Sequence, residues 1–579
     1  MRDTLRTLWP YLWRYRRGLL LGIGSLVMKD LTAAALPLVI RQVIDTMTSG
    51  IRFPLILRLS TLLVGLALVK GVFQYWMRVV LIGISRDIEY DLRNDMFAHL
   101  VRLSADFYGR RRTGDIMARA TNDLNAVRMM LGPGIMYWTE TSLTIVLATG
   151  VMLNMDWRLT FLAILPAPFV SVAVMLFGRK IHERFERIQA MFSDISSRVQ
   201  ENLSGVRMIR AYVQEKPELQ RFEQLNRDYI AQNIRLARIS GLFQPLLEGL
   251  IGFTFLIVLW AGGSQVLQGR ITLGSFVAFN TYMGMLVWPM IAMGWVVNLM
   301  QRGSASMSRI NEILRERPAI AEPERPRRLV SSRGEIAFRG VSVVYPTGRA
   351  LDAIDLDIPG GSTLAIVGHT GSGKSTLVSL IPRLMDPTEG AVLLDGTDLR
   401  EFSPGELRRL IGFVPQETFL FSASLAENIA FGVENATPEQ IRQAAELAGL
   451  APDIESFPNG YETMVGERGI TLSGGQKQRA AIARAILRDP KILILDDALS
   501  SVDTLTEERI LAGLTGVMRG RTVVLISHRV STVRVADRII VLEKGSIVEQ
   551  GTHAELATAG GYYADLYQKQ LLEEELEAI

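Results

Sequence analysis

The stretch that decides the fold of the C-terminal half is "STLAIVGHTGSGKSTLVSL", residues 362–380. In it, an apolar run typical of a strand is followed by a glycine-rich turn and a helix-like run. Glycines let backbone N–H groups turn inward and hold phosphates at a helix N-terminus. Lys374 can then reach the terminal phosphates, and Ser375 offers a hydroxyl to Mg²⁺. We therefore expect a nucleotide-binding loop formed by Gly368, Thr370, Gly371, Ser372, Gly373, Lys374, Ser375 and Thr376.

The matching metal-binding feature is "KILILDD", residues 491–497. Its near-continuous apolar run is typical of a buried parallel strand. Asp496, at the carboxyl end of that strand, is placed to hold Mg²⁺ through water. The alternative is that Asp496 caps the following helix. A second acid, Asp497, follows it directly.

Three further features set this domain apart from other phosphate-loop enzymes. The sequence "LSGGQ" at residues 472–476 precedes the helical run "KQRAAIARAIL" and forms a second potential anion site at a helix N-terminus. One γ-phosphate does not need two binding sites in one domain. We therefore expect the "LSGGQ" site to contact the nucleotide bound by a second ATPase domain, in a sandwich dimer. Gln416 lies on a loop in "VPQET", and His528 follows a strand in "VLISHR".

Length and composition limit the possible classes of protein. The chain has 579 residues, which suits two or more domains. Its net charge of +4 provides no global basic field for nucleic acid. It has no cysteine, which excludes disulfides and thiolate metal sites. No cleavable signal peptide is expected at the arginine-rich N-terminus.

Apolar windows in the first half of the chain predict six transmembrane helices. Each window can cross a hydrocarbon core of roughly 30 Å, which takes about 20 helical residues. Buried core helices are the alternative, but six such windows in half a chain disfavour it. The windows are Leu19–Ile44, Leu55–Ile84, Met129–Leu153, Leu159–Phe177, Gly241–Leu267 and Leu273–Met300.

Arginines predict the orientation of these helices. The segments 86–128 and 179–238 are long and rich in arginine, as is the N-terminus. The positive-inside rule therefore places all three in the cytoplasm. Helical periodicity and many acid–base pairs indicate that both long segments continue the spans as helices outside the bilayer. Interleaved aromatic residues and arginines suggest a short interfacial helix at residues 1–17.

The predicted domains are a transmembrane domain at 1–302, a linker at 303–333 and a soluble domain at 334–579. Three prolines among charged residues indicate an exposed linker. After it, short β-rich runs alternate with helical runs, which predicts an α/β fold around a parallel sheet. The fold class is thus a membrane α-helical domain of six transmembrane helices followed by an α/β P-loop ATPase domain.

The motifs "GHTGSGKS", "VPQETFLF", "LSGGQKQR", "LILDD", "SSVD" and "ISHR" together resemble the nucleotide-binding domain of an ATP-binding cassette (ABC) transporter. Their order and spacing both agree. With six preceding spans, the chain resembles an ABC exporter half-transporter, of the type I exporter fold, over essentially its full length. The resemblance implies ATP and Mg²⁺ as cofactors and a second half-transporter chain as partner.

The resemblance also implies roles for individual residues. Tyr345 would stack on adenine, although an ordinary strand aromatic is the alternative. Gln416 would sense Mg²⁺ and the attacking water, and His528 would contact the γ-phosphate. Asp503 would join the two sites at the dimer interface. The residues that would contact ATP held by the opposite chain are Ser473, Gly474, Gly475 and Gln476.

Other stretches resemble the parts of the family that connect the two domains. "GERG" at residues 466–469 resembles the loop that touches the membrane helices. The segments 104–123 and 201–215 resemble those that carry coupling helices, at least one of which would reach the ATPase domain of the partner.

Asp497 departs from the family pattern. The family normally has glutamate there, to orient the water that attacks the γ-phosphate; Asp497 is one methylene shorter. Misplacing such a group by about 1 Å can cost about 100-fold in rate. With an intact "LSGGQ", the chain resembles the Asp-bearing subunit of heterodimeric bacterial multidrug exporters. A homodimeric lipid or drug flippase with slow ATPase is the alternative, and an ATP-gated non-pumping membrane protein is a further one.

The substrate is expected to be hydrophobic or amphipathic: a drug, lipid or peptide exported or flipped by alternating access. The expected location is the bacterial cytoplasmic (inner) membrane, with the N-terminus and ATPase domain in the cytoplasm and membrane lipids as partners. Charges within the spans predict either a polar substrate cavity or intramembrane ion pairing. They are Lys29, Asp30, Lys70, Glu140 and Glu248. Methionines crowd the sixth span, where they suit either promiscuous binding or simple packing.

Overall fold

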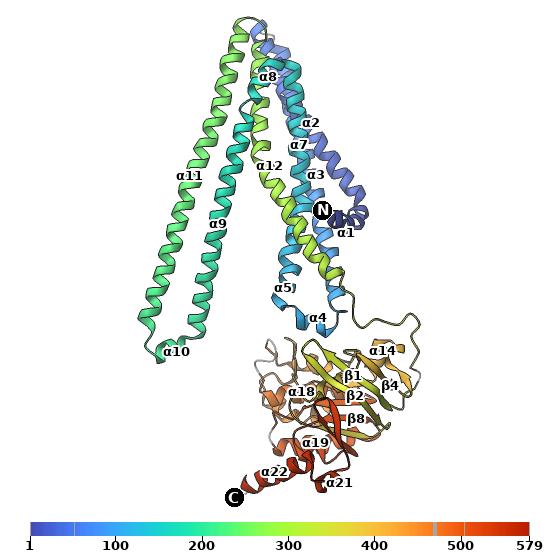
Figure 1. The fold of residues 1–579 in the computed structure, drawn as a ribbon. Coiled ribbons are helices and arrows are strands. Elements are labelled where there is room, and N and C mark those ends of the chain that lie inside the picture. Colours follow the sequence, from blue (N-terminus) through green and yellow to red (C-terminus); the bar gives the residue numbers. More distant parts are fainter. Residues whose placement is uncertain (1, 51–52, 330, 467–471, 503, 578–579) are drawn as a thin grey trace. The chain divides into compact units, whose positions relative to one another are not determined.

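The computed structural model describes residues 2–50, 53–329, 331–466, 472–502 and 504–577. The chain divides into two compact units, of which the first comprises residues 1–101 and 111–316 and the second comprises residues 102–110 and 317–579 (Figure 1). In the described residues, the first unit is helical and the second holds both β-sheets.

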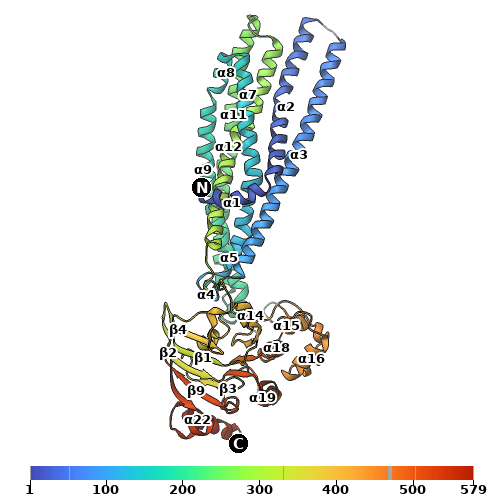
Figure 2. The same ribbon diagram turned by 90° about the vertical axis from the view of Figure 1, so that its right-hand side faces the viewer.

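The first unit is built from long helices joined by short turns. Six of them, α2, α3, α7, α9, α11 and α12, account for most of its length, and α2 and α3 lie against each other as a hairpin (Figure 2). The elements are α1 Arg2–Arg14, α2 Arg16–Ser49, α3 Phe53–Leu100, α5 Thr113–Ala118, η1 Arg119–Asp123, α6 Leu124–Met129, η2 Met130–Gly134, α7 Ile135–Met155, α8 Trp157–Ile164, α9 Ala167–Ser204, α10 Val206–Ala211, α11 Glu215–Leu267 and α12 Leu273–Leu314.

Five helical stretches in the described residues are long and apolar enough to cross a membrane: α2, α3, α8 with α9, α11 and α12. The predicted window 129–153 falls on η2 and α7. Helix α7 is 21 residues long, but Glu140, Asn154 and several threonines lower its mean hydropathy. A sixth span at α7 therefore remains a prediction from the sequence.

The membrane helices continue well beyond the thickness of a bilayer, as predicted. Helix α11 has 53 residues, or about 80 Å at ~1.5 Å per residue, compared with roughly 30 Å of hydrocarbon. Polar contacts join α11 to α9 outside the apolar windows. Arg198 Nη2 donates to Glu218 Oε1 at 2.7 Å and Arg184 Nη1 to Gln232 Oε1 at 3.2 Å. The short helix α10 connects the two (Figure 1).

Residues 113–155 form one continuous helix with two wider, π-helical turns, η1 and η2. Pro133 lies within η2 and has no N–H to donate, so a regular α-helical ladder is interrupted there. This helix packs closely on α12: a Cβ added at Gly303 would stand 2.3 Å from the Cβ of Met130. Glycine therefore permits a close approach of the two backbones.

Three predicted boundaries differ in the structure. The linker predicted at 303–333 is helical in its first part, because α12 continues to Leu314. Met307, Ile310 and Ile313 are buried, so the apolar helical periodicity does not stop at residue 302. The predicted interfacial helix 1–17 is α1, which ends at Arg14. Contacts group residues 102–110, placed in the transmembrane domain from the sequence, with the second unit.

The second unit contains two sheets. The order is β2-β1-β4-β5 in the four-stranded sheet and β10-β9-β3-β8-β7-β6 in the six-stranded sheet. Its elements are α4 Ala105–Arg110, β1 Ile336–Tyr345, β2 Gly348–Ile358, β3 Thr363–Val367, α13 Lys374–Leu380, β4 Glu389–Leu394, β5 Thr397–Asp398, η3 Leu399–Glu401, α14 Pro404–Arg409, β6 Ile411–Val414, α15 Leu425–Ala430, α16 Pro438–Leu447, α17 Ala451–Ser456, η4 Gly460–Glu462, α18 Gly474–Leu487, β7 Ile492–Asp496, α19 Thr504–Met518, β8 Thr522–Ile526, α20 Val530–Val533, β9 Arg538–Glu543, β10 Ser546–Gly551, α21 His553–Thr558 and α22 Tyr562–Glu577.

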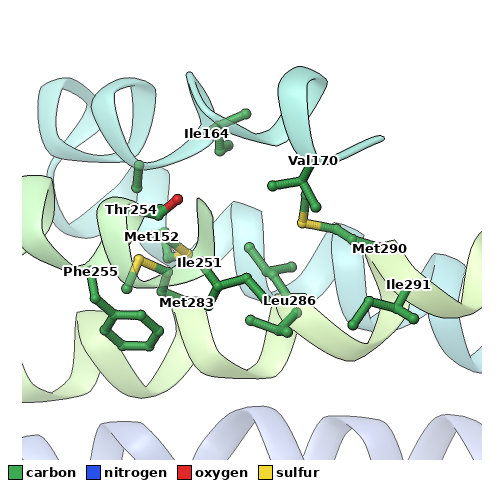
Figure 3. Close-up of a pocket in the computed structure, with 12 residues that line it drawn as sticks. Met152, Ile164, Val170, Ile251, Thr254, Phe255, Met283, Leu286, Met290 and Ile291 are labelled. Carbon is green, nitrogen blue, oxygen red and sulfur yellow. The ribbon is translucent and has the colours of Figure 1, made fainter. Parts of the chain in front are cut away.

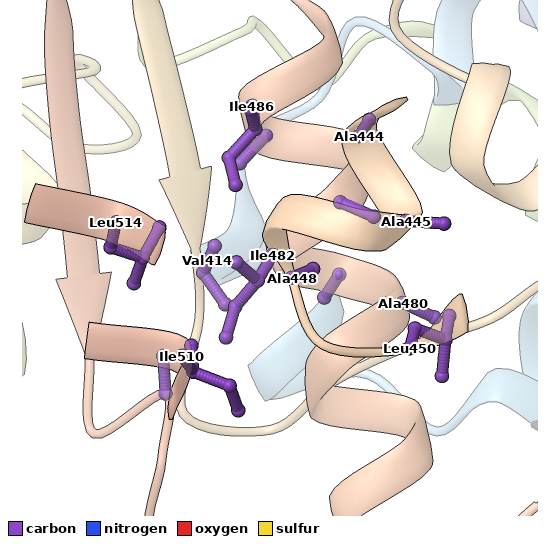
Figure 4. Close-up of a cluster of buried hydrophobic side chains, with 14 of the residues drawn as sticks. Val414, Ala444, Ala445, Ala448, Leu450, Ala480, Ile482, Ile486, Ile510 and Leu514 are labelled. Carbon is purple, nitrogen blue, oxygen red and sulfur yellow. The ribbon is translucent and has the colours of Figure 1, made fainter. Parts of the chain in front are cut away.

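Burial explains the central strands. Every residue of β3, β7 and β8 is buried, which accounts for their unbroken apolar sequences. One core cluster joins the helices α16, α18 and α19 to β6, and includes Val414, Ala445, Ile482 and Leu514 (Figure 4). Four helices of this unit start with a reciprocal capping box, which satisfies their first backbone donors. The pairs are Ser424–Glu427, Thr437–Gln440, Ser473–Gln476 and Thr552–Glu555.

The close approach at Gly303 gives a test of the packing in the first unit. We expect Gly303→Ala to lower stability by about 1–3 kcal/mol, because its methyl group meets the fixed Cβ of Met130. The control is Gly294→Ala on the same helix, where an added Cβ meets nothing within 4 Å. That change should be neutral or stabilise by about 0.5–1 kcal/mol. Thermal unfolding in detergent would show the opposite signs; equal effects would contradict the packing.

Candidate nucleotide site

Four loops of the second unit leave the same edge of its six-stranded sheet. Strands β3, β8, β7 and β6 pair in parallel, and their carboxyl ends are in register, since Asp496 pairs with Ile526 and Ile526 pairs with Ile366. Sheets of this kind bind ligands beyond the carboxyl ends of their strands. The loops that follow these strands carry the glycine-rich turn, His528, Asp497 and Gln416.

The glycine-rich turn has a backbone that only glycine fits. Gly368, Gly371 and Gly373 have φ values of +145°, +81° and +102°. A Cβ at Gly368 would lie 2.1 Å from the carbonyl oxygen of Leu542, and one at Gly373 would lie 2.5 Å from that of Ala350. The turn is thus pressed against neighbouring main chain, so side chains at these two positions would displace it.

Lys374 and Ser372 place hydrogen-bond donors inside this turn. Lys374 is 7% exposed, and its Nζ donates to the carbonyl oxygens of Gly368 at 2.9 Å and His369 at 2.8 Å. Burial lowers the pKa of Lys374, and the nearby acids Asp496 and Asp497 oppose that effect. The hydroxyl of Ser372 is buried and has no hydrogen-bond partner among the described residues. Both groups could donate to a bound phosphate.

Ser375 and Asp496, the residues predicted to hold a metal ion, meet beside the turn. Ser375 Oγ donates to Asp496 Oδ1 at 3.2 Å. Asp496 is 4% exposed, and burial raises its pKa, while Ser375 and Lys374 lower it. A hydroxyl and a carboxylate oxygen are ligands that suit Mg²⁺ together with phosphate and water. The residues present therefore fit this ion.

Asp497 has an unusual backbone conformation, with φ of +50°, which Asp adopts more readily than most residues with side chains. Its N–H donates to the carbonyl oxygen of Ile526 at 3.0 Å. Its own carbonyl oxygen accepts from Ser500 Oγ at 3.0 Å. Because the main chain is held on both sides, the reach of the carboxylate is set by the length of the side chain.

Gln478 is a buried residue that the sequence analysis did not single out. Its Nε2 donates to Ser500 Oγ at 2.9 Å, and its Oε1 accepts from the N–H of Ser501 at 3.0 Å. It thereby fastens α18, the helix that follows "LSGGQ", to the loop after Asp497. A glutamine one turn into a helix gives no signal of its partner 22 residues away.

The "LSGGQ" residues lead into α18, whose N-cap is Ser473. Ser473 Oγ accepts from Gln476 N at 3.3 Å, and Gln476 Oε1 accepts from Ser473 N at 2.9 Å. Gln476 Nε2 also donates to Asp453 at 2.9 Å. Gly475 needs its small size, since a Cβ there would be 3.0 Å from the carbonyl oxygen of Ser501. Ser473 and Gly474 are exposed.

The remaining predicted contacts lie at the surface of the same unit. Gln416 and His528 are exposed on the loops after β6 and β8. Tyr345, at the end of β1, is 37% exposed, and its hydroxyl lies 3.4 Å from Met385 Sδ. Thr370 is exposed and Thr376 is half-buried. Asp503 and residues 467–469 lie outside the described residues.

The charges within the spans are partly paired. Lys29 Nζ lies 2.7 Å from Asp30 Oδ1 and 2.5 Å from Glu140 Oε1. Lys29 and Asp30 are buried, so this cluster ties α2 to α7. Of the two interpretations left open by the sequence, ion pairing accounts for these three residues. Lys29 and Asp30 are neighbours and leave the helix in different directions, but the lysine side chain is long enough to reach the Asp30 carboxylate.

Methionines of the third and sixth predicted spans line a small apolar pocket between α7, α8, α9, α11 and α12 (Figure 3). Met152, Met283 and Met290 face it, together with Phe255 and Leu286. Its volume is about 50 Å³, far below the roughly 300–1,000 Å³ of a site for a drug-sized molecule. The methionines therefore act as packing here.

Comparisons with known proteins agree with this architecture. Residues 19–290 match the family described as "ABC transporter transmembrane region", and residues 351–500 match "ABC transporter". The Bacillus subtilis protein named "Probable multidrug resistance ABC transporter ATP-binding/permease protein YheI" is 42% identical over 86% of this chain and 85% of its own. The "Multidrug resistance-like ATP-binding protein MdlA" of Escherichia coli is 38% identical over 98% of this chain and 97% of its own.

Two further similarities bear on function. An "ATP-dependent lipid A-core flippase" of Desulfotalea psychrophila is 34% identical over 98% of this chain and 100% of its own. The solved structure of a bacterial Atm1-family ABC exporter with ATP bound superposes with a TM-score of 0.80 at 28% identity, covering 96% of this chain and 99% of that one.

Gln478 gives a test of the site. We expect Gln478→Leu to lower the free energy of unfolding by about 1–3 kcal/mol, because the N–H of Ser501 loses its partner, and to reduce ATP turnover. The control is Gln443→Leu, at an exposed position of α16. Thermal unfolding and phosphate release would be measured on both. A Gln478→Leu variant indistinguishable from the control would contradict this role.

Proposed function

The chain belongs to the ABC transporter family, and we propose that it forms one half of a heterodimeric exporter. Its family and relatives make it a multi-pass membrane protein that couples ATP hydrolysis to export. The observation that carries the heterodimer is Asp497, which follows Asp496 where the family normally has glutamate. The "LSGGQ" sequence is complete. The substitution therefore alters hydrolysis at this chain's own phosphate loop, and not the completion of the partner's site by "LSGGQ".

ATP would bind at the carboxyl edge of β3. Lys374 and the unpartnered hydroxyl of Ser372 would donate to its phosphates, in place of the carbonyl contacts that Lys374 makes here. Tyr345 would stack on the adenine. Ser375 and Asp496 would hold Mg²⁺, with Gln416 nearby, and the ion would neutralise phosphate charge. His528 would contact the γ-phosphate from the loop after β8.

Asp497 would orient the attacking water, but its carboxylate would lie farther from that water than the carboxylate of the usual glutamate. Hydrogen bonds at its N–H and carbonyl oxygen fix the main chain, so a shorter side chain is not compensated by a moved backbone. A displacement of about 1 Å is enough to cost about 100-fold in rate. We infer slow hydrolysis at the phosphate loop of this chain.

The exposed start of α18 would complete the other site. Reciprocal bonds between Ser473 and Gln476 hold it in shape before any nucleotide arrives. Ser473, Gly474, Gly475 and Gln476 would face the γ-phosphate bound by the partner chain, and Asp503 would lie between the two sites. The fast site would thus combine a glutamate-bearing partner with the "LSGGQ" of this chain.

We propose hydrophobic or amphipathic small molecules as the substrate, moved by alternating access in a bacterial cytoplasmic membrane. Names of the relatives at 42% and 38% identity refer to multidrug resistance, whereas the relative at 34% is a lipid flippase. The apolar pocket lined by Met152, Met283 and Met290 has a volume of only about 50 Å³, so it offers no further guide to substrate. A lipid substrate for a homodimer is the second candidate, favoured by the flippase relative.

The two assemblies differ in the expected effect of changing Asp497. For a heterodimer, the chain purified alone should hydrolyse ATP slowly, and Asp497→Glu should raise its rate, by up to about 100-fold if geometry alone limits it. Asp497→Asn should leave the low rate nearly unchanged. Phosphate release by the detergent-purified chain would measure all three. Brisk activity of the unmodified chain that Asp497→Asn abolishes would favour the homodimer.

A transport assay separates an exporter from an ATP-gated membrane protein. Inverted vesicles that contain the chain with its co-purified partner should accumulate a fluorescent amphipathic dye only with hydrolysable ATP. Lys374→Ala in this chain, together with the corresponding change in the partner, should abolish uptake because phosphate binding is lost. Equal dye movement with a non-hydrolysable ATP analogue would show that nucleotide binding alone opens a path, contrary to the proposal.

A further inference from the structure

The C-terminal helix α22 contacts two of the loops that surround the candidate phosphate site. The ring of Tyr562 packs on the ring of His369 in the glycine-rich turn, with centroids 4.6 Å apart and planes at 67°. Further along the helix, Gln570 Oε1 accepts from the N–H of Val530 at 2.7 Å, and Gln570 Nε2 donates to the carbonyl oxygen of His528 at 2.7 Å. One helix therefore connects the turn after β3 to the loop after β8.

Helix α22 is fixed at its N-terminal end, where Tyr562 lies and from which the helix runs on to Gln570. Tyr563 is fully buried in a cluster with residues of β3 and β9. Its hydroxyl lies 2.7 Å from His553 Nδ1. The carboxylate of Glu549 accepts from the N–H groups of Tyr562 at 2.5 Å and Tyr563 at 3.3 Å, which satisfies the first donors of the helix. The helix can thus hold a loop in place.

Gln570 forms hydrogen bonds with the main chain on both sides of Arg529, and this pair of contacts requires an amide side chain. One contact needs an acceptor and the other a donor, which glutamine supplies from one planar group. From α19, the buried carboxylate of Glu507 binds the side chains of Arg529 and Thr532. The segment that carries His528 is therefore held by α22 through its backbone and by α19 through its side chains.

We propose that Gln570 is a positioning residue that sets the location of His528 for contact with the γ-phosphate. This inference rests on the role of His528 in the proposed function, and extends it to the C-terminal helix. Gln570 acts on the peptide group of His528 and touches no nucleotide itself. Its loss should weaken recognition of the γ-phosphate while leaving binding of the adenine and the first two phosphates intact.

The test measures the preference for ATP over ADP at this chain alone, in the full complex with its partner. The probe is 8-azido-ATP labelled on the α-phosphate, displaced by unlabelled ATP or ADP, and label is counted on this chain after separation. Gln570→Met, which is of similar size but lacks the amide, should reduce the ATP-over-ADP preference about threefold to tenfold. The affinity for ADP should not change. This readout does not depend on whether the site hydrolyses ATP.

The matched control is Gln568→Met, an exposed glutamine two positions earlier on α22, which should leave the preference unchanged. His528→Ala should reduce the preference, and adding Gln570→Met to it should cause no further loss if both act through one contact. Gln570→Glu keeps the acceptor for Val530 but loses the donor to His528, and should be defective as well.

Two outcomes would overturn the inference in different ways. If His528→Ala lowers the preference and Gln570→Met does not, Gln570 has no positioning role and the proposed function stands. If His528→Ala has no effect, the role of His528 fails and the inference fails with it. Equal loss of ATP and ADP affinity in Gln570→Met would indicate general damage to the fold and would also contradict a role through His528.

Discussion

Parallel pairing of β3, β8, β7 and β6 is the constraint on which the nucleotide unit depends. These strands run in the same direction and stay in register, so their carboxyl ends lie along one edge of the sheet. The polar residues of the candidate site lie on the loops that follow those ends. The glycine-rich turn, Asp496, Asp497, Gln416 and His528 come from distant parts of the sequence but share one edge. Strands β3, β7 and β8 are fully buried, so this edge is as rigid as the core that holds it.

Three glutamine side chains hold the loops and helix start near that edge in place by hydrogen bonds. Gln476 holds the start of α18, Gln478 joins α18 to the loop after Asp497, and Gln570 holds the loop that carries His528. An amide can donate and accept at once, so each one ties two backbone or side-chain groups without adding a charge next to the proposed nucleotide site. Carboxylates in the same places would add negative charge where the proposal places phosphates.

Local motifs could be predicted from the sequence, whereas distant partners could not. The glycine-rich turn and the strand ending at Asp496 are recognisable because their chemistry is contained in a few consecutive residues. Gln478 and Gln570 have partners 22 and 42 residues away in the sequence, and Lys29 pairs with Glu140, 111 residues away. Sequence periodicity does not predict contacts of this kind. The predicted linker begins within α12, because buried residues such as Met307 and Ile310 extend this helix beyond the apolar window.

The two π-helical turns in residues 113–155 also bear on how this helix can evolve. A π turn holds one more residue than the α-helical turn it replaces. Losing one residue from η1 or η2 would restore a regular turn and leave the faces on either side where they are. A deletion elsewhere in the same helix would rotate every following side chain by about 100°. Insertions and deletions among homologues should therefore collect at these two turns.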